Sequence, residues 1–498
     1  MKNENVPNEL SEVDVEPSAN DSATTSSDPQ VEEHMEEASP SRGRRNLIDP
    51  NEELTDESVR QKVIALAVPA VAENLLMSLV GMADMIMVGG VGAAAIASVG
   101  LTNQPMMFAM AIFMALNTGT TAIVARLIGA GEREEANRAA RQTLVMVIVM
   151  GIIVSCIMYM LAETILLFMG AEADTMAHGV SYFKIVAISL IFNTVMLSVN
   201  SMVRGSGDTR TPLYNNIVTN LVNLVFNYLL INGIWIFPEL GVTGAAVATC
   251  MSRMVGSVLA LYVVLKGDHQ IAISLKERFS FDFDIARRVF AVGIPAAIEQ
   301  FVMRLGQILF TRTVSGLGTT VYAAHQVALN IVSLSFSPGQ GFGMAATTLV
   351  GQSLGAKRPD WAEKSARATR KIGMFVAGTM ALIFFFFGSQ VAWFYAPTEP
   401  LVVENAAIAL KIIALVQIAQ SSQFILAGAL RGAGDTKWTL ISTVVGVWGF
   451  RVVLSFILVQ LLHWGLVGAW IAMAVDQLMR SAVILYRFNS NKWKTVRV

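Results

Sequence analysis

The strongest constraint on this chain is a series of twelve apolar stretches, each long enough to cross a lipid bilayer as a helix. The hydrocarbon core of a bilayer takes about 20 helical residues to span, and only helices or closed barrels satisfy their backbone hydrogen bonds there. We therefore expect an all-α polytopic membrane protein. The expected spans are residues 62–89, 95–121, 140–166, 177–203, 212–235, 241–266, 287–314, 320–348, 370–394, 402–429, 438–462 and 465–487.

Composition agrees with a membrane protein. Hydrophobic residues make up 54% of the 498 positions and charged residues only 15%, which is outside the usual range of soluble domains. Residues 1–54 differ from the rest, because they carry 14 acidic and 4 basic side chains and few large apolar ones. Such a segment cannot bury enough surface to offset its ordering entropy. We expect a disordered acidic tail there, and we interpret Cys156 and Cys250, which lie within spans, as small core residues.

Basic residues fall only in alternate connections. Lys and Arg follow spans 2, 4, 6, 8 and 10 and close the chain, whereas connections such as "GVGAAAIA" and "FPELGVTG" carry none. The positive-inside rule then places both termini in the cytoplasm, which requires an even number of spans. We expect a multi-pass protein of the bacterial cytoplasmic (plasma) membrane. Its parts are a cytoplasmic tail (1–54), an N-terminal lobe (55–266), a cytoplasmic linker (267–286), a C-terminal lobe (287–490) and a second tail (491–498).

The two groups of six spans are related by an internal repeat. At a constant offset of 226, Pro69 meets Pro295, Glu73 meets Glu299 and Gly129 meets Gly355; slightly later, "RGSGDTR" (204–210) answers "RGAGDTK" (431–437) at an offset of 227. Six spans per half preserve the orientation, so the repeat is parallel. Transporters use such halves to enclose a cavity at the membrane midplane and to alternate between two open states.

Two acidic residues stand within the first span. Asp84 lies in "LLMSLVGMADMIMVGG", where a charge costs about 2.5–3.5 kcal/mol on insertion scales. Glu73 precedes it by eleven residues, so both project from one helix face, roughly 16 Å apart along the axis. We expect Asp84 to face the protein interior. For Glu73, either an interior position or a solvated one near the membrane surface is open. Pro69 removes a backbone hydrogen bond and allows the helix to bend.

The fifth span offers partners for these acids. Asn223 and Asn227 are four residues apart and share a helix face, with Asn220 one turn earlier. Amides can bind a carboxylate, a cation or water, and they also serve as hydrogen-bonding links between membrane helices. The spacing leaves both roles open. A carboxylate among them would act as a switch, because neutralising it with H⁺ or Na⁺ changes which helix packing is more stable.

The second half does not repeat this pattern. The offset of 226 places Phe310 opposite Asp84, while Glu299 and Gln300 answer Glu73 and Asn74. The ion-type site is therefore expected in the N-terminal half. Arg304 and Arg312 lie in the seventh span and are candidate counter-ions of Glu299, although an arginine near the end of a span more commonly extends its side chain to the surface.

Five segments resemble the multidrug and toxic compound extrusion (MATE) family in order and spacing. They are "VPAVAENLLMSLVGMADMIMVGGVG", "RGSGDTRTP", "YAAHQVALN", "TTLVGQSLGA" and "AGALRGAGDT", and the resemblance covers roughly residues 58–490. It implies twelve helices in two six-helix lobes. It also implies export of cationic or amphipathic compounds in exchange for H⁺ or Na⁺.

The resemblance also assigns residues. The family's first-span aspartate matches Asp84, its two polar positions of the fifth span match Asn223 and Asn227, and a sixth-span threonine is best matched by Thr249. A possible Na⁺ site at Asp84, Asn223 and Asn227 follows, although some members have Asp at the second position, so Asn227 offers less negative charge. The expected cavity or gating residues are Pro69, Glu73, Glu299, Gln300 and Met303.

One branch of the family carries ion-site carboxylates in spans 7 and 10. Those positions align here with Met303 and Gln420, so the second site is expected to be absent, apart from partial substitution by Glu299. This favours the branch named after DNA-damage-inducible protein F, in which coupling lies in the N-terminal lobe.

Other functions remain as alternatives. A lipid-linked oligosaccharide or lipid flippase of the same superfamily would tend to have more spans and a more basic cavity. A membrane-embedded enzyme would need a catalytic cluster, and no phosphate-binding loop, HExxH motif or nucleophile elbow occurs. We expect a non-enzymatic transporter with no cofactor beyond the coupling ion, H⁺ or Na⁺. The expected partners are small-molecule drugs or toxic metabolites and the lipid bilayer, with no nucleic acid, and the protein is expected to be a monomer.

Overall fold

The computed structural model describes residues 48, 53–89, 93–171, 173–234, 237–267, 269–274 and 281–496, without the side chains of 82–86, 88–89, 93–97, 173–175 and 177–178. The side chain of Asp84 and nearly all of the predicted tail (1–54) therefore lie outside the described residues. Everything described belongs to one compact unit, Ser41–Val498.

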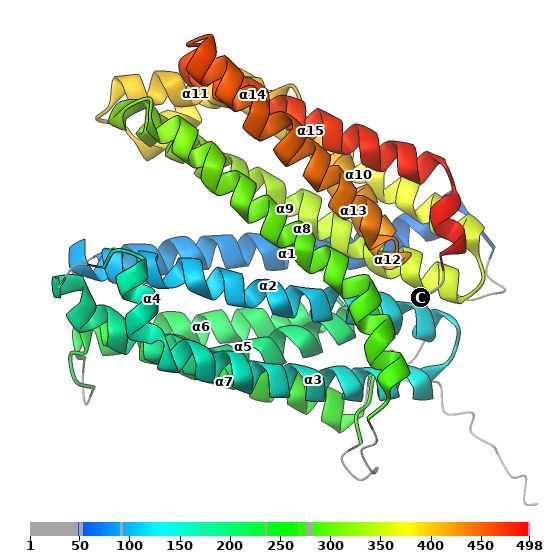
Figure 1. Ribbon diagram of the computed structural model, residues 1–498. Coiled ribbons are helices and arrows are strands. Elements are labelled where there is room, and N and C mark those ends of the chain that lie inside the picture. The colour runs from blue at the N-terminus through cyan, green and yellow to red at the C-terminus, as the bar shows by residue number, and fades with distance from the viewer. Residues whose placement is uncertain are drawn as a thin grey trace, which may run out of the picture. The chain divides into compact units, whose positions relative to one another are not determined.

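Helices form at all twelve predicted spans (Figure 1). The first half contains α1 (Asp56–Gly89), α2 (Ala93–Gly129), α3 (Arg133–Met160) with its continuation α4 (Ala162–Phe168), α5 (Ala173–Gly205), α6 (Arg210–Asn232) and α7 (Gly241–Lys266). The second half contains α8 (Phe283–Ser315), α9 (Thr319–Gly355), α10 (Pro359–Tyr395), α11 (Pro400–Ala414) with α12 (Gln417–Gly432), α13 (Thr436–Thr443) with η1 (Val444–Val452), α14 (Val453–Ser455) and η2 (Phe456–Leu461), and α15 (Gly465–Asn489), followed by the short η3 (Lys492–Thr495).

These helices confirm the all-α polytopic fold. Among the described residues, nine helices are long and apolar enough to cross a membrane, and α11 with α12 supplies a tenth as a broken span. The remaining two spans, α6 and α9, are less apolar. Five asparagines lie between residues 215 and 227 of α6, and α9 contains five glycines and four serines. Helices that present such residues to neighbouring helices rather than to lipid do not need a fully apolar surface.

Two spans of the second half depart from a regular α-helix. The chain bends by 57° between α11 and α12, where the sequence predicts one continuous span. The stretch from α13 to η2 contains two π-helical segments, η1 and η2. Such wide turns are frequent at functional positions. At Gly446 in η1, an added Cβ would meet the side chains of Asp476 and Arg480 at 2.3 Å, so the widened turn fits closely around two charged residues of α15.

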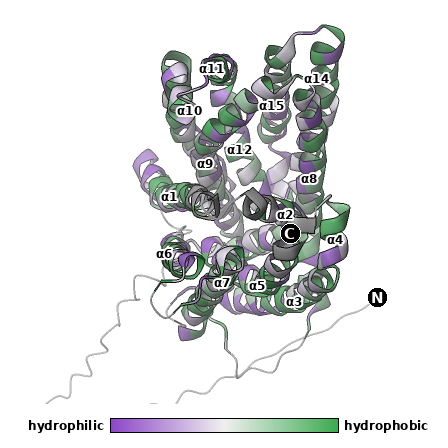
Figure 2. Ribbon diagram, turned by 90° about the vertical axis from the view of Figure 1, so that its left-hand side faces the viewer, coloured by the Kyte–Doolittle hydropathy of each residue, from purple (hydrophilic) through white to green (hydrophobic). Residues whose placement is uncertain are grey.

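Each half places the start of its first helix in the core of the other half. Val59, Val63 and Leu66 of α1 are buried in a cluster formed mainly by α9, α10, α12 and α15. In the same way, Ile285 and Val289 of α8 are buried with residues of α2, α3, α5 and α7. Figure 2 shows α1 at the boundary between helices α2–α7 in the lower part of the picture and α8–α15 in the upper part. The halves are therefore linked by two exchanged helices as well as by the chain.

The two halves meet most closely at the end of the unit that carries the loops "RGSGD" (204–208) and "RGAGD" (431–435), here called the RGxGD end. A Cβ on Gly355 of α9 would lie 1.9 Å from the carbonyl oxygen of Arg126 in α2, and a Cβ on Gly129 would lie 2.0 Å from that of Gln352. The two contacts are equivalent under the repeat, because an offset of 226 takes Gly129 to Gly355 and Arg126 to Gln352. Helices α2 and α9 thus cross backbone against backbone, and we call this contact the α2–α9 crossing.

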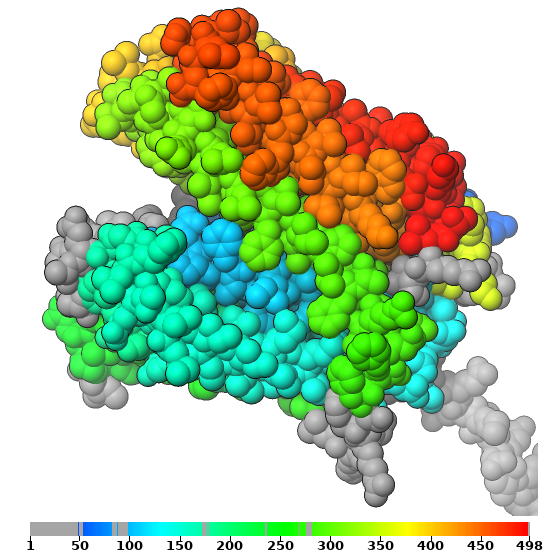
Figure 3. All heavy atoms as spheres, in the orientation of Figure 1, coloured from blue at the N-terminus to red at the C-terminus, as the bar shows by residue number. Residues whose placement is uncertain are grey.

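Side chains of α9 extend this contact to α5. Thr348 Oγ1 donates to the carbonyl oxygen of Arg204 (2.9 Å), and Gln352 Nε2 donates to that of Gly205 (3.1 Å). At the opposite end, Figure 3 shows the surface hollowed between the helices of the first half and those of the second. The unit is thus closed at the RGxGD end.

Segments at the edges of the predicted lobes also pack against the helices. Ile48 is fully buried in the cluster that includes Leu66, and Lys364 donates to the carbonyl oxygen of Leu54. In the predicted C-terminal tail, Trp493 is buried and stacks on Phe488. Ile48, Leu54 and Trp493 thus pack against the helices, although all three fall within the predicted tails 1–54 and 491–498.

Candidate functional site

Glu73 is buried inside the first half. Of the two environments that the sequence left open for it, interior or solvated, the structure has the interior one. Glu73 is 3% exposed, one turn beyond Pro69 in α1. Its Oε1 accepts hydrogen bonds from Arg204 Nη1 of α5 (2.9 Å) and from Asn216 Nδ2 of α6 (2.6 Å). Three helices of the N-terminal half therefore meet at one carboxylate, and its charge is balanced by an arginine that comes from an RGxGD loop.

The other oxygen of this carboxylate, Oε2, is buried and has no hydrogen-bond partner among the described residues. The same is true of the amide nitrogens of Asn74, the next residue of α1, and of Asn220 in α6. A buried charged oxygen without a donor costs free energy that a protein recovers only by binding water, a cation or a proton. The free oxygen of Glu73 is therefore a candidate position for binding one of these.

Three of the four predicted coupling residues come together farther along α6. Asn227 Nδ2 donates to Asn223 Oδ1 (3.0 Å), and Asn223 Nδ2 lies 3.5 Å from both Thr249 Oγ1 and Ser252 Oγ of α7. Asn223 and Asn227 are at most 5% exposed. The described donors and acceptors are all neutral, so a cation here would need charge from position 84.

The helix backbone shows how far along the bundle residue 84 of α1 lies relative to the asparagines of α6. Spans α1 and α6 run in the same direction, and Glu73 bonds to Asn216. Asp84 follows Glu73 by eleven residues, and Asn227 follows Asn216 by the same number. Both steps cover roughly 16 Å of helix, so position 84 of the helix backbone lies at about the level of Asn227. The side chain of Asp84 lies outside the described residues.

The second half contains the counterpart of the Glu73 site. Glu299 of α8 is 2% exposed, and its Oε1 accepts from Arg431 Nη2 (2.8 Å), the arginine of the second RGxGD loop. Thr439 donates to Oε2 (2.8 Å) and Thr443 to Oε1 (3.4 Å). Arg431 is the counter-ion, so the two candidates Arg304 and Arg312 were wrong. All oxygens of Glu299 are therefore used, whereas Glu73 retains a free one.

The RGxGD loops are held in place by their aspartates. Asp208 accepts from the backbone nitrogens of Arg210 (2.9 Å) and Thr211 (3.0 Å) and lies 3.4 Å from His269 Nδ1, while Asp435 pairs with Arg487 (2.6 Å). Burial raises the pKa of Asp208, but the hydrogen bonds from His269 and Thr211 outweigh it and hold this pKa below its usual value. The stabilising charge is thus present above the ordinary pKa of 3.8 and is lost only as the pH falls through a still lower value.

Met303 lies beside a second charged cluster in the C-terminal half. Its sulfur is 3.7 Å from Arg480 Nη1, and Asp476 on the same helix as Arg480 pairs with Arg451 of η1 (2.5 Å). All three charged residues are at most 6% exposed. Together they carry one excess positive charge. Met303 therefore faces a cation. Gln300, the neighbour of Glu299, is half-buried.

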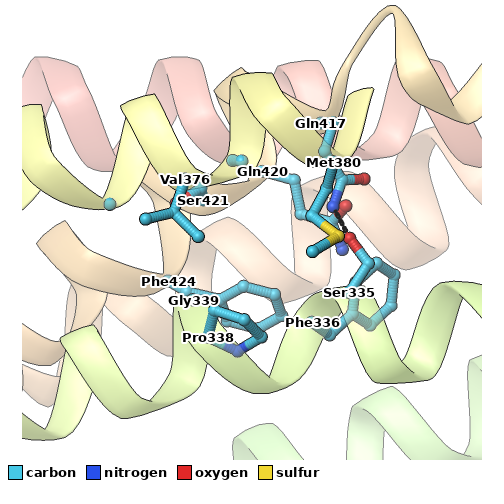
Figure 4. A pocket seen from close by; sticks show the side chains of 12 residues that line it. Ser335, Phe336, Pro338, Gly339, Val376, Met380, Gln417, Gln420, Ser421 and Phe424 are labelled. Carbon is cyan, nitrogen blue, oxygen red and sulfur yellow. Dashed lines mark hydrogen bonds between the residues drawn. The ribbon is translucent and has the colours of Figure 1, made fainter. Parts of the chain in front are cut away.

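Gln420 lines a small cavity between α9, α10 and α12 (Figure 4). Gln417 donates to Ser335 there, and the amide of Gln420 has no partner among the described residues. The cavity has a volume of about 10 Å³, enough for roughly one water molecule.

Arg204, Arg431 and Asn216 were not predicted as site residues. The two arginines belong to connections that carry the positive-inside signal, yet each is the partner of a buried carboxylate. The available signal was the repeat itself, because Glu73 and Glu299 recur at nearly the same offset as "RGSGD" and "RGAGD". In the described part of the chain, no group of three His, Cys, Asp or Glu residues is placed to hold a metal ion.

Comparison with known sequences identifies relatives over most of the chain. The model of the MatE family matches residues 69–229 and 295–457. The "Probable multidrug resistance protein NorM" of Thermotoga maritima is 33% identical over 447 residues, which cover 89% of this chain and 95% of that protein. The "Multidrug resistance protein PmpM" of Pseudomonas aeruginosa is 29% identical over 390 residues, 78% of this chain and 82% of that protein.

Solved structures share the fold. One, described as the outward-facing conformation of a multidrug resistance MATE family transporter of the MOP superfamily, superposes with a TM-score of 0.82 at 23% identity, over 87% of this chain and 97% of that one. A MOP superfamily transporter from Pyrococcus furiosus, described as having a binding pocket of reverse polarity, gives a TM-score of 0.81 at 23% identity over the same shares. At this identity the likeness concerns the fold alone.

Proposed function

This chain belongs to the MatE family of multidrug and toxic compound extrusion transporters, which are membrane proteins and not enzymes, and from that premise we propose that it exports cationic or amphipathic compounds across the bacterial plasma membrane. Export uphill needs an energy source, and we propose antiport with H⁺ or Na⁺. The relatives named for multidrug resistance support the substrate class.

The observation that carries the coupling proposal is the row of asparagines on α6. Asn216 binds the carboxylate of Glu73, and Asn223 and Asn227 form a buried network with Thr249 at the level of position 84. A neutral polar network beside a membrane-buried acid lets that acid exist in charged and neutral forms. Asp84 is proposed as the group that changes charge, with the asparagines as its hydrogen-bonding partners.

Alternating access is proposed to involve the α2–α9 crossing. The positive-inside rule places the RGxGD end in the cytoplasm, so closure at this end corresponds to an outward-facing state. Return to the inward-facing state then requires α2 and α9 to part. The change of charge at Asp84 supplies the difference in free energy between the two states.

Reconstitution tests the transport proposal. In proteoliposomes loaded with ethidium, a lipophilic cation, we expect efflux when a pH gradient or a Na⁺ gradient is imposed alone, and the active gradient identifies the ion. Asp84→Asn is expected to abolish the gradient-driven component and the drug resistance that the protein confers, at unchanged membrane abundance, because the switch carries no charge. Full activity of Asp84→Asn would contradict the coupling role. Absence of efflux together with movement of a lipid-linked oligosaccharide would favour the flippase alternative.

A second variant tests the cation site. Asn227→Asp adds a carboxylate beside Asn223 and is expected to increase stabilisation by Na⁺, because a ligand that binds only the folded state raises its stability. The measurement is the thermal unfolding midpoint of the purified protein with and without Na⁺ at constant ionic strength. Asn232→Asp, at the exposed end of the same helix, is the matched control. An equal response to Na⁺ in both variants would argue against cation binding at this network.

A further inference from the structure

We propose that Glu73 is a second proton-binding site of the N-terminal half, and that its ion pair with Arg204 holds the RGxGD end closed while the carboxylate is charged. The inference rests on the proposed antiport, and it adds a carboxylate and a gate to it. The proton would bind to the unpartnered Oε2 of Glu73, which converts the carboxylate to a neutral acid and leaves Arg204 without its counter-ion.

The comparison of the two halves supports a binding role for Glu73 in particular. Both Glu73 and Glu299 are nearly fully buried and both pair with the arginine of their own RGxGD loop. Glu299 uses both oxygens, with hydroxyl groups of Thr439 and Thr443 as additional donors. Glu73 leaves Oε2 without a donor. The repeat thus contains one saturated carboxylate, suited to a fixed structural pair, and one that still has the capacity to bind.

A polar route reaches this free oxygen from the level of position 84. Asn216, Asn220, Asn223 and Asn227 follow one another at spacings of four, three and four residues, which places them along one face of α6. The amide nitrogens of Asn220 and Asn74 have no partner among the described residues. Amides with spare donors bind water molecules, and a row of water molecules can conduct protons. The asparagines therefore connect the proposed switch at Asp84 with Glu73.

Arg204 links the carboxylate to the closed end. Its side chain binds Glu73, and its own carbonyl oxygen accepts the hydrogen bond from Thr348 of α9. The next carbonyl, that of Gly205, accepts from Gln352, whose backbone lies at the α2–α9 crossing. The same residue thus contacts both the proton site and the opposite half. Movement of Arg204 on loss of its partner would disturb two of the bonds between α9 and α5.

Helices α2, α6, α7, α9 and α10 pack against α1. Among the described residues, Arg204 is the only charged group that bonds to Glu73. Arg126 of α2 donates to the carbonyl oxygen of Val496, and Arg253 of α7 donates to Ser189. The remaining ones are Arg210 at the start of α6, Lys266 at the end of α7, His325 of α9 between the rings of Phe310 and Trp470, and the group Asp360, Glu363, Lys364, Arg367, Arg370 and Lys371 in the first turns of α10.

The test measures the opening of the RGxGD end against pH without any transported substrate. Spin labels are attached at Glu132→Cys and Lys357→Cys, exposed positions that follow α2 and α9, in full-length protein in which Cys156 and Cys250 are replaced by alanine. We expect a longer label-to-label distance to gain population as the pH is lowered. Glu73→Gln is expected to populate the longer distance already at alkaline pH and to lose the wild-type midpoint, because only the response of Asp84 remains. Glu299→Gln, the matched variant of the other half, is expected to keep the wild-type midpoint.

A second pair of variants keeps the test decisive if Glu73→Gln does not fold. Thr348→Val removes the bond to Arg204 and is expected to raise the open population at alkaline pH, while Thr347→Val, whose hydroxyl bonds within its own half to Gly428, is not. The proposal is overturned if Glu73→Gln keeps the wild-type midpoint, if both glutamine variants lose it equally, or if Na⁺ at constant pH moves the distances and protons do not. Gradient-driven efflux of wild-type proteoliposomes is scored separately, so that failure here leaves the antiport proposal standing.

Discussion

Gly355→Ala and Gly129→Ala are each expected to hold the RGxGD end open and to reduce drug efflux by tenfold or more. A Cβ at Gly355 would lie 1.9 Å from the carbonyl oxygen of Arg126, and one at Gly129 would lie 2.0 Å from that of Gln352. Both atoms belong to backbone and cannot rotate away. Ordinary van der Waals contact begins at 3.4 Å, so α2 and α9 must separate by more than an ångström for either methyl group to fit.

The magnitude follows from the usual free energy of overpacking. An extra methyl group in a tightly packed site destabilises by about 1–3 kcal/mol, and here it acts only on the closed state. A shift of about 1.4 kcal/mol changes an equilibrium tenfold. The measurements are the distance between spin labels at Glu132→Cys and Lys357→Cys, and the drug resistance of cells with equal amounts of each variant.

A glycine with free space around it is the control. Gly100 lies on α2, and no atom stands within 4 Å of the position that its Cβ would take. Gly100→Ala is therefore expected to leave both the distances and the efflux unchanged. If Gly355→Ala closes normally, or if Gly100→Ala impairs efflux as strongly, the close backbone crossing is not the element that shuts this end.

Asp476→Asn is expected to destabilise the folded protein by about 3–5 kcal/mol, the usual result of removing one partner of a buried ion pair. Asp476 is fully buried and pairs with Arg451, and Arg480 lies one helical turn away on α15. The amide keeps the shape of the side chain but removes the only negative charge of the cluster. Arg451 then loses the partner of its ion pair and remains buried beside Arg480. The measurement is unfolding of the purified full-length protein in detergent, followed by heat and by denaturant.

Arg480→Met tests the same cluster by removing a positive charge instead of the negative one. It removes the excess positive charge and replaces a buried cation with an apolar side chain of similar length, a change that is often neutral or stabilising. We expect unchanged or higher stability for Arg480→Met. The double variant Asp476→Asn/Arg480→Met is expected to lose less stability than Asp476→Asn alone, because neighbouring charges couple. A large loss on Arg480→Met would show that Arg480 has a structural partner beyond this cluster.

The overall architecture was predictable because it depends on patterns in the local sequence. Lipid requires long apolar helices, so the twelve spans can be read from hydropathy alone, and the duplication can be read from motifs at a constant offset. The bend between Ala414 and Gln417 and the π-helical turns of η1 were not predicted. Both occur within continuous apolar sequence, and they depend on how the helix packs against its neighbours.

The partners of the buried acids were harder to predict. An arginine in a loop contributes to membrane orientation wherever its side chain points, so the charge pattern could not show that Arg204 turns inward to Glu73. Only the backbone arrangement brings residues 131 positions apart into contact. Pairing of Asn223 with Asn227 was predictable from their spacing on one helix, and the contact of Asn223 with Thr249 agrees with the resemblance. Whether Asp84 completes that group stays a prediction.

The α2–α9 crossing has a further consequence for how this molecule arose. Gly129 touches Gln352 and Gly355 touches Arg126, so each copy of the repeat presents the same patch to the other, which is the isologous geometry of a two-fold homodimer. A homodimer must change both subunits with every substitution. Fusion of the copies into one polypeptide removes that restriction, and one copy here has acquired a row of asparagines while the other has acquired buried arginines. The crossing thus keeps the two-fold symmetry of the repeat, whereas the residues on either side of it differ between the copies.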